Sequence, residues 1–108
     1  MSFFDNKYSK REKTYRRSYY IDSSLLTQLE SLSKIYRARV SEFINDSIEE
    51  LIISENIKVY ERDKSELSVK YTVLVRESNL QGLDELCRKY GISVSKLVNI
   101  AIRNIINN

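Results

Sequence analysis

The residues of this chain best suited to chemistry are basic and cluster near its start. Residues 1–17 carry a clear excess of cations over acids: Lys7, Lys10, Arg11, Lys13, Arg16 and Arg17 against Asp5 and Glu12. The whole chain has a formal net charge of only +3, so the remainder is close to neutral. A local basic segment favours a polyanion such as nucleic acid or a lipid surface. A solvated tail that binds nothing would have the same composition.

Catalysis and metal binding have little support in the composition. The 108 residues include no His, one Cys and two Gly, and they contain no Gly-rich phosphate-binding motif. Enzymes and metal sites need such residues in recognisable spacings, so we expect no enzyme, no metal and no cofactor. Cys87 cannot form a disulfide within the chain, and packing on a helix is its simplest role.

Nothing in the sequence predicts contact with a membrane. There is no long apolar run and no Pro, and the first residues lack the charged start and apolar stretch of a secretory signal. The basic segment also lacks an amphipathic apolar face of useful length. We therefore expect a mostly helical, cytoplasmic protein that makes no membrane contact.

An internal repeat determines the expected architecture. Residues 16–54 align without a gap with residues 70–108, at an offset of 54 positions. The matched pairs are mostly apolar and helically spaced: Leu26 with Leu80, Leu29 with Leu83, Leu32 with Leu86, Tyr36 with Tyr90, Val40 with Val94, Asn45 with Asn99, Ile48 with Ile102 and Ile52 with Ile106. Each repeat is near the ~40-residue size below which a core rarely folds unaided. The two repeats must therefore share one core.

Each repeat is predicted to form a short strand followed by two helices. Aromatic and β-branched residues favour strands over 15–21 and 69–75. Asp22 is a plausible cap for the first helix, Gly91 ends the equivalent helix, and Ser93 caps the next one. We expect a basic arm, a first unit, a linker and a second unit at 1–14, 15–53, 54–68 and 69–108, with second helices at about 40–53 and 94–106.

The two predicted strands should pair with each other. One strand per repeat leaves unpaired backbone groups along both edges and cannot make a sheet alone. An antiparallel pair about a pseudo-two-fold axis satisfies both repeats equally. The expected fold class is thus mostly α with a short antiparallel β-ribbon. Such a ribbon is narrow enough to enter the major groove of DNA.

The order strand, helix, short turn, helix, with the turn Gly91-Ile92-Ser93-Val94-Ser95, resembles the ribbon-helix-helix family of DNA-binding proteins, the Arc, MetJ and CopG type. The resemblance covers both repeats, whereas members of that family usually carry one unit per chain and dimerise. It implies a tandem ribbon-helix-helix pseudo-dimer, β-α-α-linker-β-α-α, in which two fused units act as one dimer.

The resemblance implies that outward-facing strand residues read the edges of DNA bases. They are Arg16, Ser18, Tyr20, Lys70, Thr72 and Leu74. The alternation of the strands supports this face independently, because the residues between these positions then point to the helices: Tyr19, Ile21, Tyr71, Val73 and Val75. Arg and Lys suit guanine, hydroxyls suit several bases, and Leu contacts only a thymine methyl. The two strands differ, the second reading less, so we expect an imperfect palindrome in the preferred duplex.

The same resemblance implies that DNA phosphates bind where each second helix begins, because free amides and the helix dipole attract anions there. The residues are Arg39, Val40 and Ser41 in the first repeat, and Ser93, Val94, Ser95 and Lys96 in the second. Glu42 opposes such binding, and both Ser93 and Ser95 suit ordinary helix capping equally well. Arg17, at an inward strand position, could swing to a phosphate. Further salt-sensitive contacts are expected from the arm, at Lys10, Arg11 and Lys13.

These expectations favour sequence-specific binding of double-stranded DNA, first of all by a transcriptional repressor located on the nucleoid. An accessory protein of plasmid partition or conjugation is an alternative, and so is a helical protein-interaction module that binds no DNA. Antitoxins of the resembled family usually extend beyond the second helix, whereas this sequence ends at Asn108, so we expect that role less. Further copies of the chain could bind adjacent sites.

Overall fold

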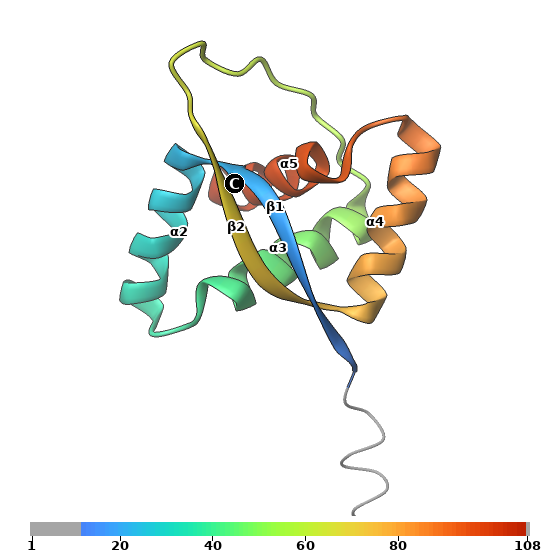
Figure 1. Ribbon diagram of the computed structural model, residues 1–108, viewed down its shortest axis with the longest axis horizontal. Coiled ribbons are helices and arrows are strands. Elements are labelled where there is room, and N and C mark those ends of the chain that lie inside the picture. The colour runs from blue at the N-terminus through green and yellow to red at the C-terminus, as the bar shows by residue number, and fades with distance from the viewer. Residues whose placement is uncertain (1–11, 108) are drawn as a thin grey trace, which may run out of the picture.

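The computed structural model describes residues 12–107, in which a two-stranded antiparallel sheet is combined with four helices (Figure 1). In chain order the elements are β1 (Thr14–Asp22), α2 (Ser23–Tyr36), α3 (Val40–Ser54), β2 (Ser68–Arg76), α4 (Glu77–Tyr90) and α5 (Val94–Ile106). The mostly helical class with a short antiparallel ribbon is confirmed. Each strand is one residue longer at both ends than predicted, so Thr14 belongs to β1 rather than to the arm.

The ribbon is centred on one pair of residues. Ser18 lies opposite Thr72, and the antiparallel register continues from there to Thr14 opposite Arg76 and Asp22 opposite Ser68. The two strands lie side by side across α3 and α5, with α2 and α4 on either side and the linker looping over one end (Figure 1). Both strands therefore rest on the same helical layer, and no other described element covers their opposite face.

A single core joins the two repeats. The alternation of the strands buries Tyr19, Ile21, Val73 and Val75 against the helices. The helices contribute further fully buried side chains, namely Leu29, Ile44, Ile48, Leu51, Leu83, Leu97, Val98, Ile100 and Ile102. Burial of one Ile or Leu side chain stabilises a fold by about 1.5–3 kcal/mol. Because both repeats contribute to the same cluster, neither has a core of its own.

The turn between the two helices differs between the repeats. Gly91 ends α4 with φ 66°, a left-handed conformation that glycine adopts without strain. Arg37 ends α2 in the same conformation with φ 52°, which costs a residue with a side chain about 1 kcal/mol. Ser93 then caps α5, accepting a hydrogen bond from the amide of Lys96 at 3.3 Å, as predicted. Arg39 holds the equivalent position of α3 without a side-chain cap.

Two glutamates cap the first helices across the repeats. The amide and hydroxyl of Ser24 in α2 donate to Oε1 of Glu66, at 2.9 and 2.8 Å. The amide of Ser78 in α4 donates to Oε1 of Glu12 at 3.0 Å. These hydrogen bonds lower the pKa of both carboxyl groups below the usual glutamate range. Their contribution to stability is therefore present above that range and is lost as the pH falls through the lowered pKa values.

Candidate nucleic-acid interface

The ribbon face turned away from the helices carries all six residues that were expected to read bases. Arg16, Ser18, Tyr20, Lys70, Thr72 and Leu74 are all exposed, Tyr20 to 58% and Leu74 to 52%. Arg16 lies opposite Leu74, and Tyr20 lies opposite Lys70. Each end of the ribbon therefore combines one cation with one bulky uncharged side chain. Because the strands are antiparallel, each end takes one of these residues from β1 and one from β2.

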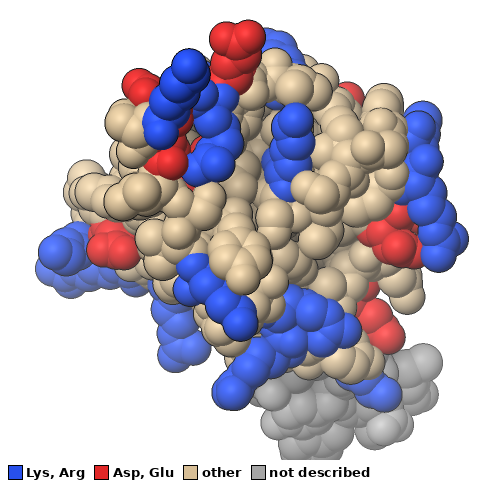
Figure 2. Space-filling view, turned by 45° about the horizontal axis from the view of Figure 1, so that its top comes forward, with Lys and Arg blue, Asp and Glu red and all other residues tan. Residues whose placement is uncertain are grey.

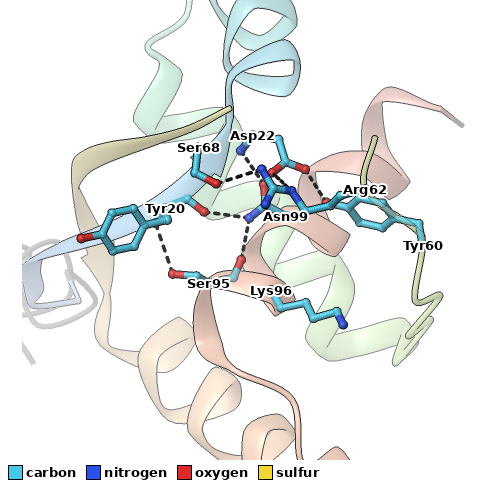
Figure 3. Close-up of a pocket in the computed structure, with 8 residues that line it drawn as sticks. All are labelled: Tyr20, Asp22, Tyr60, Arg62, Ser68, Ser95, Lys96 and Asn99. Atoms are coloured by element: carbon cyan, nitrogen blue, oxygen red, sulfur yellow. Dashed lines mark hydrogen bonds and ion pairs between the residues drawn. The ribbon is translucent and has the colours of Figure 1, made fainter. Parts of the chain in front are cut away.

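One end of the ribbon is fixed to α5 by the buried side chain of Asn99, which is 6% exposed (Figure 3). Its Nδ2 donates to the carbonyl oxygen of Tyr20 at 2.8 Å, and its Oδ1 accepts from the amide of Asp22 at 2.8 Å. The amide of Tyr20 donates to Oγ of Ser95 at 3.2 Å. These contacts satisfy backbone groups on the outer edge of β1 that no further strand pairs with. The start of α5 is thereby held beside Tyr20.

The other end is fixed to α3 by Asn45, which is 5% exposed. Its Nδ2 donates to the carbonyl oxygen of Leu74 at 2.9 Å, and its Oδ1 accepts from the amide of Arg76 at 3.0 Å. Asn79 of α4 donates to the same Oδ1 at 3.0 Å, and this contact has no equivalent at Asn99. Both asparagines thus reach from one repeat to the strand of the other, and we call them the asparagine clamps.

The start of α5 carries no acidic side chain of its own. Its first turn contains no Asp or Glu, and Lys96 is exposed there. The hydroxyl of Ser93 caps the helix, so the capping interpretation holds for this residue. Ser95 does not cap but accepts from the ribbon, which leaves its own hydroxyl hydrogen available as a donor. Together with the free amides of a helix start, Lys96 favours an anion at this position.

The start of α3 differs in charge. Arg39 is exposed at the N-cap position, Val40 packs against the core, and Ser41 is half-buried. Glu42 lies exposed in the first turn, where its charge repels an anion that approaches the same amides. The two helix starts therefore occupy equivalent places beside the ribbon but differ in electrostatic potential, which is less favourable to an anion at α3.

Arg17 in β1 and Lys13 just before it are the other described residues that were expected to contact phosphates. Arg17 is exposed, although its strand position faces the helices, and its Nη1 donates to the carbonyl oxygen of Arg16 at 2.9 Å. Lys13 is exposed just before the strand, whereas Lys10 and Arg11 lie outside the described residues. Lys and Arg side chains gather over the lower part of the view in Figure 2. The ribbon thus has a basic border at this end.

The linker forms one wall of a cavity of about 330 Å³ beside Tyr20. Arg62 reaches from the linker to Asp22, with Nε 2.9 Å from Oδ1, and the hydroxyl of Tyr60 donates to Oδ2 at 2.8 Å (Figure 3). Asp22 is only 4% exposed. Burial, and next the hydrogen bond to Asp22, raise the pKa of Tyr60. Asp22 does occupy the N-cap position of α2, but its side chain makes no cap, because these two linker residues bind the carboxylate.

Three sets of residues at this interface were not assigned a role from the sequence. They are the asparagine clamps, the capping pair Glu12 and Glu66, and the linker pair Tyr60 and Arg62. The first two sets match at the 54-residue offset, so the repeat contains a usable signal. The linker pair has no counterpart in the other repeat and leaves no such signal.

Neither a metal centre nor a membrane segment is evident in the part of the chain that the structure describes. Residues 12–107 contain no group of three or more acidic or cysteine side chains that could hold a metal ion. No helix among them is both long enough and apolar enough to cross a bilayer. Cys87 is half-buried against the core, and burial raises the pKa of its thiol, in keeping with a packing role.

Comparisons with protein-family models, with curated proteins and with solved structures found no match to this chain. The geometry of the ribbon and of the two helix starts is therefore the basis for assigning a function.

Proposed function

We propose that the chain is a tandem ribbon-helix-helix pseudo-dimer that binds double-stranded DNA sequence-specifically and acts as a transcriptional repressor. The observation that supports this most is the exposed face of the ribbon. The asparagine clamps fix the ends of this ribbon beside the starts of α3 and α5. Equivalent contacts on both sides of the Ser18–Thr72 pair are what two fused units of one dimer would make.

In this proposal the ribbon enters the major groove. Arg16 and Lys70 donate to guanine O6 and N7 at opposite ends, and Leu74 contacts a thymine methyl. The starts of α3 and α5 lie beside the two ends, so they meet the phosphates that flank the groove. The basic residues before β1 add affinity that falls as salt rises. A protein held in this way over a promoter excludes the transcription machinery, which is the basis of the proposed repression.

Selection from a randomised duplex pool, followed by sequencing at two salt concentrations, tests the proposal. We expect enrichment of a short, imperfectly palindromic motif. Replacing Arg16, Ser18 and Tyr20 together with Ala should relax the sequence preference but leave low-salt binding, because the second strand and the phosphate contacts remain. A matched control replaces Arg88, Ser31 and Tyr36, which are exposed on α2 and α4, and should keep the preference. Failure to bind any duplex, or an unchanged preference in the ribbon variant, would contradict the proposal.

A further inference from the structure

Two hydroxyl groups face each other at the centre of the ribbon. Oγ of Ser18 and Oγ1 of Thr72 are 2.8 Å apart, and either atom can be the donor. Both residues are exposed on the face that carries Arg16 and Lys70. The pair lies where the register is centred, so each hydroxyl belongs to a different repeat and has the same place in it.

A hydroxyl pair of this kind can reverse its hydrogen-bonding pattern. Each hydroxyl has one hydrogen and two lone pairs, and the bond between them uses only one of the two hydrogens. The residue that accepts keeps its own hydrogen for an external acceptor, and the residue that donates offers lone pairs to an external donor. Rotation of the two hydrogens exchanges these roles without moving any heavier atom. The ribbon centre therefore has no fixed donor side.

The consequence for DNA rests on the proposed function. In the major groove, turning a base pair round exchanges the positions of its donors and acceptors. We propose that the Ser18–Thr72 pair accepts the central base pair of the site in either orientation, so that specificity is confined to the two flanking blocks. A reversal of the base pair is answered by a reversal of the hydroxyl pair, because the two hydroxyls are placed symmetrically about the centre.

The ends of the ribbon have no such freedom. Arg16 and Lys70 are donors only, so each requires acceptors such as guanine O6 and N7. Their partners across the ribbon, Leu74 and Tyr20, differ in size and polarity, so the two ends are not interchangeable. The site is thus two specified blocks of unequal character, separated by a centre that tolerates inversion.

Paired duplexes test this inference. The selected duplex is compared with one in which only the central base pair is inverted, and dissociation constants are measured by fluorescence anisotropy. The wild-type protein should bind both within about twofold, because either arrangement makes the same hydrogen bonds. Inverting the base pair that faces Arg16 should instead weaken binding at least about tenfold, since a bidentate contact to guanine is lost.

Variants at the centre sharpen the test. Ser18→Ala and Thr72→Val each leave a single hydroxyl, which contacts only one side of the central base pair, so each should weaken binding to both orientations by about fivefold relative to the wild type. Thr72→Ser keeps both hydroxyls and should remain indifferent to orientation. Circular dichroism and urea unfolding establish that all three variants are folded, which is expected because both positions are exposed.

Two results would overturn the inference while leaving the proposed function intact. One is wild-type discrimination against central inversion as strong as that against inversion at Arg16. The other is wild-type affinity for both orientations in Ser18→Ala and Thr72→Val, which would show that the hydroxyls only join the strands. If the pool yields no enriched duplex, the proposed function fails, and this inference fails with it.

Discussion

At one end of the ribbon the start of α5 presents a serine cap and Lys96 to solvent, and at the other end the start of α3 presents Arg39 and Glu42. The contacts beneath these surfaces are the same, because an asparagine bonds the same two backbone groups of the strand at each end. Contacts that shape the shared core are thus alike in the two repeats, whereas outward-facing charges differ. The molecule therefore has a nearly symmetric core, but its surface charges distinguish one end of the ribbon from the other.

The ends also differ in how their terminal strand residues are paired. Asp22, the last residue of β1, is buried and bonds to Arg62 and Tyr60 of the linker. Arg76, the last residue of β2, forms ion pairs with Asp46 and Glu49 of α3, at 2.9 and 3.1 Å, and both acids are largely exposed. The linker therefore gives one end of the ribbon an ion pair with a buried carboxylate, whereas the ion pairs at the other end involve exposed carboxylates.

The asparagine clamps should give the largest effects on stability. Asn45→Ala and Asn99→Ala leave buried backbone groups of the ribbon unpaired, so each should lower the free energy of unfolding by about 1–3 kcal/mol. The loss should be greater for Asn45, because Asn79 also loses a partner. Urea denaturation measures both values, and Asn104→Ala, which removes a more exposed amide, serves as the control. A loss no greater than that of the control would show that the clamps do not fix the ribbon.

The two arginines at the strand ends should differ from each other. Arg62→Met leaves the buried Asp22 carboxylate with less compensation, and we expect a loss of about 1–2 kcal/mol, reduced because Arg62 itself is half-exposed. Arg76→Met removes exposed ion pairs and should cost about 0–1 kcal/mol. The same urea experiment compares them. Adding Asp22→Asn to Arg62→Met should recover part of the loss, and the absence of any recovery would contradict the role given to the buried charge.

Charge reversals at the two helix starts should have opposite effects on DNA binding. Lys96→Glu should weaken affinity for the selected duplex about fivefold, while Glu42→Lys should strengthen it by a smaller factor. The slope of log affinity against log salt concentration should change by about one phosphate contact's worth in each case, becoming shallower for Lys96→Glu and steeper for Glu42→Lys. The matched controls are Lys34→Glu and Glu30→Lys on the exposed side of α2. Equal effects in the variants and controls would indicate a general charge effect and no phosphate site.

Much of the architecture could be predicted because the sequence repeats itself. Apolar spacing placed the helices to within a residue or two, and alternation identified Tyr19, Ile21, Val73 and Val75 as inward-facing. Pairing between the strands followed from the need of a lone strand for a partner. The same alternation places the six outward-facing residues on one face, although what they bind is still a proposal.

The contacts of Asp22 and Arg17 could not be predicted, because they depend on tertiary placement. The local sequence predicts that the Asp22 side chain caps α2. The structure instead pairs its carboxylate with Arg62, which lies forty residues further along the chain. An inward strand position predicts burial for Arg17, yet its side chain lies exposed along its own strand, with Nη1 donating to the carbonyl oxygen of Arg16. Local pattern determines the elements, and distant segments determine which polar groups they meet.

The clamps and caps that cross between the repeats also constrain how the chain folds. Asn99 reaches back 79 positions to Tyr20, and Ser78 reaches back 66 positions to Glu12. Contacts so distant in sequence form late, and proteins dominated by them fold slowly. During synthesis β1 is made long before β2, so its backbone remains unpaired until the second repeat follows. The first repeat therefore exposes a strand edge and half a core for that interval, the kind of intermediate that aggregates most readily.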